Sequence, residues 1–184
     1  MAFLDLVRER RSVRRYEAGR PVERDKLDRC LEAARLAPSA SNAQPWRFVV
    51  VDDPALRERV ARETFGPLVS FNHFSLQAPV LVVCVAEEHS LKTRIGGFLM
   101  RRRYSGMDMG IAAEHFCLQA VEEGLGTCML GWFDERGVRR VLDIPAPTRV
   151  GLIITVGYEA LSEGDEPPRR PRKSLDEVRA YNRY

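Results

Sequence analysis

The apolar positions of the chain follow two patterns, and each pattern predicts one kind of element. A repeat of about 3.6 residues marks one face of a helix, whereas a short continuous apolar run indicates a strand covered on both faces. The helical repeat lies in residues 3–9, 25–36, 54–64, 105–123 and 134–142. The apolar runs, rich in valine and isoleucine, lie in residues 46–51, 80–85 and 150–156. The chain therefore alternates between predicted helices and predicted strands.

Two pairs of residues indicate where helices begin. Ser105 with Asp108, and Ser174 with Glu177, have the capping-box spacing of a hydroxyl and an acid three residues apart. The first pair predicts the start of a long helix that ends at Gly124, and the second predicts a short terminal helix. The side chains that the long helix is expected to bury are Ile111, Ala112, Phe116 and Ala120.

The composition is that of a soluble globular protein. The chain has 184 residues, of which 45% are hydrophobic and 30% charged, and this predicts one domain over residues 1–184. Its last part, from about residue 159, is charged and proline-rich, so it is expected to form an extended arm. No apolar run is long enough to cross a membrane, and the N-terminus does not resemble a signal peptide. Because the four cysteines lack CxxC spacing, they are expected to be reduced, buried thiols of a cytoplasmic protein.

Basic residues cluster at three places, although the net charge is only +3, from 29 basic and 26 acidic residues. The clusters are residues 10–15, residues 101–103, and the set Arg170, Arg172 and Lys173. Guanidinium groups bind phosphate oxygens in a bidentate manner, and Ser12 adds a hydroxyl inside the first cluster. The residues alone leave three alternatives open for that cluster: a phosphate site, a nucleic-acid patch and a solvated surface. Residues 101–103 suit a solvated helix end or a site for dinucleotide phosphates.

Residues 37–46, Ala-Pro-Ser-Ala-Ser-Asn-Ala-Gln-Pro-Trp, form a polar loop between a helix and a strand. Pro38 and Pro45 fix φ near both ends and move the preceding residue out of the right-handed helical region. The loop carries two hydroxyls and two carboxamides, groups that hydrogen-bond but neither ionise nor attack at neutral pH. Such a set suits a planar polar heterocycle better than bond cleavage. The alternative is a connector whose Ser and Asn satisfy the backbone of a turn.

The segment Gly124-Leu-Gly-Thr-Cys-Met129 is not a dinucleotide-binding fingerprint. Position 129 is Met where the third glycine belongs, and the segment follows a helix instead of a strand. Gly126 and Gly131 nevertheless permit close approach of the backbone to a ligand. The sequence shows no Ser-His-Asp, Cys-His or paired-carboxylate pattern, and its histidines have no metal-ligand spacing.

Four motifs in order resemble the nitroreductase family of flavin enzymes. They are Arg-Arg-Ser-x-Arg-x-Tyr at 10–16, Ala-Pro-Ser-x-x-Asn-x-Gln-Pro-Trp at 37–46, Gly-Leu-Gly-Thr-Cys at 124–128, and Arg-Lys-Ser-Leu at 172–175. The resemblance implies an α+β fold, a mostly antiparallel sheet of four or five strands flanked by helices. The alternation of elements alone would equally suit a doubly wound parallel sheet. The resemblance also implies FMN, a homodimer, hydride transfer from NADH or NADPH, and a ping-pong reduction of a small organic acceptor such as a nitroaromatic or a quinone.

The resemblance assigns roles to residues in each motif. It implies that Arg10, Arg11 and Ser12 contact the FMN phosphate and ribityl chain, with Arg14 toward the pyrimidine edge of the ring. Residues expected to contact the ring are Pro38, Ser39, Ala40, Asn42, Gln44 and Asn72. It further implies that Met129, Leu130 and Gly131 cover one side of the flavin, with a backbone N–H aimed at N5. Many family members carry an acid in this loop, and this chain carries none. Arg172, or else Arg170 or Lys173, is expected to reach the phosphate from the arm.

No catalytic acid, base, nucleophile or metal of the protein is expected, because the flavin carries the chemistry. Two other functions remain open at this point. One is a flavin-binding protein that stores, delivers or degrades FMN without NAD(P)H turnover. The other is a nucleic-acid-binding module built on residues 10–15 and 101–103. The low net charge and the interspersed acids argue against that module.

Overall fold

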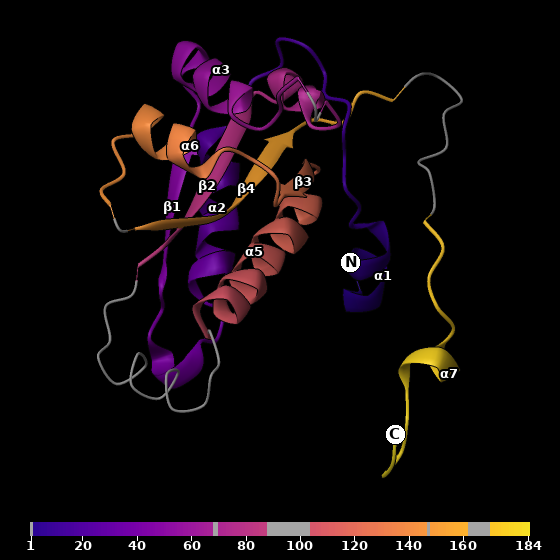
Figure 1. Ribbon diagram of the computed structural model, residues 1–184. Coiled ribbons are helices and arrows are strands. Elements are labelled where there is room, and N and C mark those ends of the chain that lie inside the picture. The colour runs from indigo at the N-terminus through magenta and orange to yellow at the C-terminus, as the bar shows by residue number, and fades with distance from the viewer. Residues whose placement is uncertain (1, 68–69, 88–103, 147, 162–169) are drawn as a thin grey trace.

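The computed structural model describes residues 2–67, 70–87, 104–146, 148–161 and 170–184 (Figure 1). The helices are α1 (Phe3–Glu9), α2 (Arg24–Arg35), α3 (Pro54–Arg62), α5 (Tyr104–Glu122), α6 (Glu135–Val141) and α7 (Leu175–Val178), with the 3₁₀ turns η1 (Ala40–Asn42) and η2 (His73–Gln77). The strands are β1 (Trp46–Val51), β2 (Val80–Ala86), β3 (Gly126–Leu130) and β4 (Arg149–Gly157). The basic cluster at 101–103 lies outside the described residues.

The described strands form one sheet in the order β1-β2-β4-β3, and every neighbouring pair is antiparallel. This confirms the predicted α+β class with an antiparallel sheet and removes the doubly wound parallel alternative. Three of the strands coincide with the predicted apolar runs. The fourth, β3, lies in the Gly-Leu-Gly-Thr-Cys segment, for which the apolar pattern predicted no strand.

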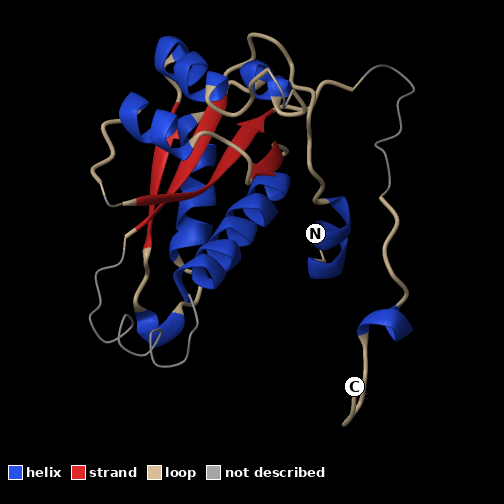
Figure 2. Cartoon of the chain, viewed as in Figure 1, coloured by secondary structure: helices blue, strands red, loops and turns tan. Residues whose placement is uncertain are grey.

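Helices cover both faces of the sheet, and this explains why its strands are apolar at nearly every position (Figure 2). On β2, the even-numbered positions from Val80 to Cys84 pack in one core cluster with α2 and α5. The odd-numbered positions from Leu81 to Val85 pack in a second cluster with α3, α6 and η2. Successive side chains of a strand point to opposite faces, so both sets are buried. The four cysteines are also buried and unpaired, as predicted.

Helix α5 corrects two predictions made from its sequence. As described, it begins at Tyr104, so Ser105 lies inside its first turn and does not cap it. The carboxylate of Asp108 instead accepts a hydrogen bond from the backbone N–H of Ala40, which precedes it by 68 residues. Ile111 was expected to be buried but is 40% exposed, whereas Phe116 is fully buried. The apolar side chains of α5 therefore extend around the helix beyond the face that packs against the rest of its own chain.

The two ends of the chain pack little against the rest of the molecule. No residue of α1 is buried, and every described residue of the arm from Arg170 onward is exposed. Figure 1 shows the arm in yellow, extending away from the sheet and ending beyond α7. The predicted capping box of Ser174 and Glu177 is confirmed at the start of α7. In the described part of the chain, no helix combines the length and apolarity needed to span a membrane.

Candidate functional site

The N-terminal arginine motif docks against β3. The backbone N–H of Val13 donates to the carbonyl of Thr127 at 2.8 Å, and Ser12 forms an isolated parallel bridge with the same residue. Gly126 makes this approach possible, because a Cβ there would lie 2.7 Å from Cγ2 of Val13. The close approach that Gly126 permits is thus to Val13. Gly131, at the end of the same segment, faces open space.

Basic residues from both ends of the sequence gather around Cys128. Burial raises the pKa of the Cys128 thiol, while the positive charges of Arg14, Arg170 and Arg10 act in the opposite direction. A hydrogen bond between the side chains of Ser12 and Cys128 also lowers that pKa. The structure therefore brings the motif at residues 10–14 and the start of the basic arm segment to the same end of the sheet. Arg172 and Lys173 are exposed, and Arg172 donates to the carbonyl of Pro171 at 3.4 Å.

Two arginines of the N-terminal motif, Arg10 from the predicted phosphate site and Arg14 from the predicted ring edge, interact with other groups of the chain. Nε of Arg10 lies 3.0 Å from Oε1 of Glu114 on α5. Arg14 is exposed, donates to the carbonyl of Ser12 at 3.2 Å, and lies over the ring of Phe74 at 5.9 Å. Arg14 is therefore accessible to a ligand at the surface, whereas Arg10 is held against α5.

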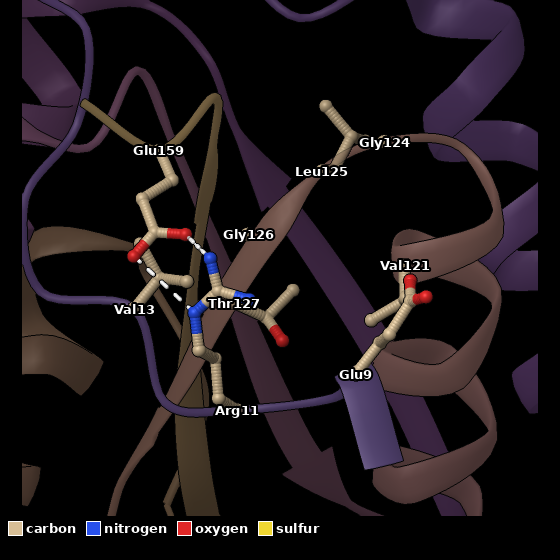
Figure 3. A pocket seen from close by; sticks show the side chains of 9 residues that line it. All are labelled: Glu9, Arg11, Val13, Val121, Gly124, Leu125, Gly126, Thr127 and Glu159. Atoms are coloured by element: carbon tan, nitrogen blue, oxygen red, sulfur yellow. Dashed lines mark hydrogen bonds and ion pairs between the residues drawn. The ribbon is translucent and has the colours of Figure 1, made fainter. Parts of the chain in front are cut away.

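A pocket of about 170 Å³ lies between this motif and β3 (Figure 3). Its lining residues are Glu9, Arg11, Val13, Val121, Gly124, Leu125, Gly126, Thr127 and Glu159. Arg11 and Glu159 form an ion pair through both carboxylate oxygens, which Figure 3 shows as two dashed lines. Glu159 is the first residue of the arm and also forms a bridge with Tyr16. A phosphate bound by Arg11 would compete with Glu159 for the same guanidinium.

The polar loop at 38–44 has a compact shape of its own. The backbone N–H of Gln44 donates to Oγ of Ser39 at 2.9 Å, and Nε2 of Gln44 donates to Oδ1 of Asn42 at 3.3 Å. Ser41, Asn42 and Gln44 have φ values of 53°, 52° and 47°. Non-glycine residues rarely adopt this left-handed region, so the loop holds a specific shape. Asn42 and Gln44 are exposed, while Ser39 and Ala40 are half-buried.

The loop and the arginine motif lie near opposite ends of α5 within one chain. Asp108, near the start of α5, contacts Ala40, whereas Ser12 pairs with Thr127 just after the end of the helix. From Asp108 to Glu122 the helix rises about 21 Å, at about 1.5 Å per residue. Figure 1 shows η1 and β3 at these two ends. One chain therefore does not bring Ser12 and the loop together, and Arg10 contacts Glu114 at a point between them.

Asn72 is buried and links two loops. Its Nδ2 donates to the carbonyl of Trp132 at 2.9 Å and to that of Thr64 at 3.2 Å. Beside this link lies a second pocket, of about 460 Å³, lined by residues 63–67 and 132–134. The exposed rings of Phe71 and Trp132 meet edge to face, with centroids 6.4 Å apart. Trp132 directly follows Gly131, in the Gly-Trp-Phe run at 131–133, whereas Phe71 comes from the segment before η2.

Three comparisons with known proteins agree with this arrangement. The model of the Nitroreductase family matches residues 7–72 and 68–158. The structure of an FMN-dependent nitroreductase from Clostridium difficile R20291 has a TM-score of 0.77 and 28% identity, and the match covers 99% of this chain and 100% of that one. An NADH dehydrogenase from Thermus thermophilus is 30% identical over 189 residues, which are 89% of this chain and 89% of that protein. An iodotyrosine deiodinase from Thermotoga neapolitana is 28% identical over 200 residues, covering 98% of this chain and 97% of that protein.

The antiparallel sheet, its helical layers and the basic residues beside β3 define an α+β protein of the nitroreductase fold. Because the family model and a relative of 30% identity each cover most of the chain, the assignment extends beyond the fold. The chain belongs to the Nitroreductase family.

Proposed function

We propose that the chain is an FMN-dependent oxidoreductase that takes hydride from NADH or NADPH and reduces a small organic acceptor. The observation that carries the proposal is the docking of Ser12 and Val13 on Thr127, which places the arginine motif beside β3. Arg170 is also close enough for its charge to lower the pKa of Cys128 on that strand. A phosphate carries a charge of about −1.5 to −2 at neutral pH and binds best to several charged or hydroxyl donors together. The donor set at β3 fits this group.

The phosphate half of the site is expected at the accessible donors, Arg14 and Ser12, with Arg170 joining them from the arm. Arg10 is held against Glu114 and contributes its charge, and it is free to rotate toward an anion only if that ion pair opens. Arg11 is paired with Glu159, and its guanidinium can bind the phosphate only if that ion pair opens. Arg172 and Lys173, both exposed, are further candidates from the arm.

The ring half of the site is the loop at 38–44, with Met129, Leu130 and Gly131 opposite it. FMN, when bound, supplies the hydride-accepting and hydride-donating chemistry at its ring. The chain's own contribution is to hold the ring: Ser39, Asn42 and Gln44 offer hydroxyl and amide groups, and Gly131 leaves room for backbone contact. Donor and acceptor then use the same exposed side in turn.

A second copy of the chain is needed to complete this site, because one chain holds Ser12 and the loop near opposite ends of α5. The surface offers a suitable face. Phe3, Leu4 and Val7 of α1 and Met107 and Ile111 of α5 are exposed apolar side chains. Contiguous exposed apolar side chains of this kind mark interaction surfaces in soluble proteins. We therefore propose a homodimer with FMN between the subunits.

The acceptor is expected to be flat and aromatic. Phe71 and Trp132 are exposed beside Gly131, and their rings meet edge to face. Exposed aromatic faces favour stacking with a planar ligand. Nitroaromatics and quinones fit this surface, and so does an iodinated phenol of the kind that the relative from Thermotoga neapolitana is named for.

The test is the flavin content and the reductive half-reaction of the purified chain. We expect a yellow protein that releases FMN and not FAD on denaturation, and whose visible absorbance falls on anaerobic mixing with NADH or NADPH. A panel of nitroaromatic, quinone and iodinated phenol acceptors should then restore the absorbance. A colourless protein that stays colourless with added FMN would contradict the proposal. Flavin that is bound but reduced by neither donor would favour storage or degradation of FMN.

A matched pair of variants tests the phosphate half. Arg14→Leu should weaken FMN binding about tenfold or more, because a hydrogen bond to a charged group contributes about 1.5–3 kcal/mol. Arg140→Leu makes the same change at an exposed arginine of α6 and should leave FMN binding unaltered. Equal affinities of the two variants in a fluorescence titration would show that Arg14 does not contact the cofactor.

A further inference from the structure

Asp108 is a buried carboxylate of α5 that accepts a hydrogen bond from outside its own helix. Its exposed fraction is 5%, although it lies only four residues from the described start of α5. A buried carboxylate is costly unless hydrogen-bond donors reach it. Among the described residues, the backbone N–H of Ala40 reaches Asp108, with the nitrogen 3.2 Å from each carboxylate oxygen. The burial of Asp108 is thus connected to the loop at 38–44.

Ala40 is the residue at which the loop leaves extended backbone. Ser39 is extended, with φ −142° and ψ 156°, and η1 begins at Ala40. Three of the next four residues, Ser41, Asn42 and Gln44, then have positive φ. Backbone in this region stays in place only where the surroundings fix it. At one end the fixing contact is Asp108 on Ala40, and at the other it is the side chain of Ser39, which accepts from the N–H of Gln44 at 2.9 Å.

The contact joins the loop to a rigid element. Helix α5 packs in the larger part of the core with α2 and the sheet, and Met109 and Ala112, which follow Asp108, are buried. A side chain at this point of α5 is therefore fixed in space, whereas Ser41, Asn42 and Gln44 are exposed. The hydrogen bond from Ala40 to Asp108 therefore fixes one end of the exposed loop, whose backbone has positive φ, to the rigid helix.

We propose that Asp108 is a positioning residue that holds the loop at 38–44 in the shape that receives the flavin ring before the flavin arrives. This inference rests on the proposed function. When the binding-competent conformation of a protein is only partly populated, its apparent affinity for the ligand falls in proportion to that population. Loss of the Asp108–Ala40 hydrogen bond lowers the population of the competent loop and therefore the affinity for FMN, although Asp108 itself does not touch the flavin.

The experiment compares Asp108→Ala with Asp108→Asn in the full-length chain. Alanine removes the acceptor, whereas the amide oxygen of asparagine still accepts from Ala40. Asp28→Ala, at an exposed aspartate of α2, is the matched control. Three quantities are measured for each: the FMN dissociation constant by quenching of flavin fluorescence, amide hydrogen exchange of residues 39–44 with and without FMN, and the melting temperature.

Asp108→Ala should weaken FMN binding about tenfold and accelerate exchange of the amides at 40–44 about tenfold in the flavin-free chain, since a hydrogen bond to a charged acceptor is lost. Asp108→Asn, whose neutral amide oxygen still accepts from Ala40, should recover a clear part of both quantities. A purely structural role would lower the melting temperature of Asp108→Ala without changing the FMN affinity of the folded fraction, and that result would overturn the proposal. So would an asparagine variant as weak as the alanine variant, because it would assign the effect to charge.

Two further outcomes keep this inference separate from the proposed function. If the wild-type chain binds no FMN, the proposed function fails. Independently of that result, amide exchange at 40–44 that is the same in Asp108→Ala as in the wild type would show that Asp108 does not order the loop. If Asp108→Ala does not fold, Asp108→Ser replaces it, because the serine hydroxyl is too short to reach Ala40. Wild-type exchange and affinity in a folded Asp108→Ser variant would likewise overturn the proposal.

Discussion

Gly126 is the residue on which the docking of the arginine motif depends. It lies in the first position of β3, and an added Cβ would stand 2.7 Å from Cγ2 and 2.9 Å from Cβ of Val13. Val13 is buried and donates its N–H to Thr127, so it has no free direction in which to move. The pairing of Ser12 with Thr127 follows from the same close approach. A change at Gly126 therefore acts on the donors of the predicted phosphate site through the backbone.

We predict that Gly126→Ala destabilises the fold and weakens FMN binding together. Overpacking of this kind costs about 1–3 kcal/mol, and the displaced segment carries Ser12 and Arg14. Gly110→Ala is the control for stability alone, because Gly110 is helical, exposed and faces open space in one chain but lies between Met107 and Ile111 on the proposed dimer face; alanine there should raise stability by about 0.5–1 kcal/mol. Thermal or urea unfolding and flavin titration measure both effects. A stable Gly126→Ala variant with normal FMN affinity would show that Val13 moves aside without consequence.

Side chains such as Asp108 mark the limit of residue-scale prediction from the sequence. Ser105 and Asp108 have the spacing of a capping box, and the local pattern contains nothing that points to Ala40, 68 residues earlier. Arg11 is similar: its motif predicts a phosphate contact, whereas the folded chain adds Glu159 as a partner from the far end of the sequence. Local spacing indicates which residues are candidates for the site, but the partners of their side chains depend on the tertiary structure.

At the scale of elements, burial decides which strands the sequence reveals. β1, β2 and β4 carry long valine and isoleucine runs because helices cover both of their faces. β3 is short and contains Gly, Thr and Cys, and it becomes a strand because it pairs along β4 from Gly126 to Leu130. Its pairing is a non-local feature that periodicity cannot reveal. The expected loop at Met129 and Leu130 is therefore the end of a strand, which holds the segment before Gly131 more rigidly than a loop would.

Glu123 joins two elements, α2 and α5, and gives the fold a dependence on pH. The hydrogen bond from Arg29 is the main cause that lowers the pKa of Glu123 to about 2. Its two oxygens accept from Nε and Nη2 of Arg29 at 2.7 and 2.8 Å. Because the pKa is lower in the folded than in the unfolded chain, the ionised carboxylate stabilises the fold above its unfolded pKa of about 4.3. That contribution is lost as the pH falls from about 4.3 toward the folded value.

Glu123→Gln should therefore flatten the acid side of the stability profile. We predict that the free energy of unfolding of the wild type falls more steeply than that of the variant between about pH 4.3 and pH 2. At neutral pH the variant should be the less stable of the two. Glu122→Gln, at the exposed neighbouring position, is the control. Urea unfolding over this pH range measures the difference, and parallel curves for wild type and Glu123→Gln would contradict the prediction.

At the scale of the whole molecule, the arm is the part that its own chain leaves uncovered. Leu175, Val178 and Tyr181 are exposed, although α7 has a complete capping box and a regular start. A capped helix with apolar side chains on its surface gains little from forming in water, since most helical stability comes from packing. Arg170 lies near enough to Cys128 for its charge to lower the pKa of that thiol, so the start of the basic segment lies on the β3 side of the sheet. The apolar part is then placed to pack on a second subunit.

Two truncations and one full-length variant separate the uses of the arm. Ending the chain after Tyr158 removes the Glu159–Arg11 ion pair and the arm together, whereas ending it after Leu161 keeps that ion pair and removes the rest. We predict that both truncations weaken the dimer and lower FMN affinity, because the same segment supplies Arg170 and the apolar residues of α7. If Glu159 competes with the phosphate for Arg11, adding Glu159→Gln to the chain that ends after Leu161 should free Arg11. That double change should bind FMN more tightly than the truncation alone.

In the full-length chain, Leu175→Ser with Val178→Ser should weaken the dimer and leave the FMN affinity of the remaining dimer close to wild type. Burial of one such side chain contributes about 1.5–3 kcal/mol, so the dimer dissociation constant should rise at least about tenfold. Sedimentation over a range of protein concentrations measures the dimer, and flavin titration at high concentration measures the site. Leu36→Ser is the control, since Leu36 is an exposed leucine at the end of α2. An unchanged dimer in the double variant, with full FMN affinity in both truncations, would show that the arm serves neither the second subunit nor the phosphate.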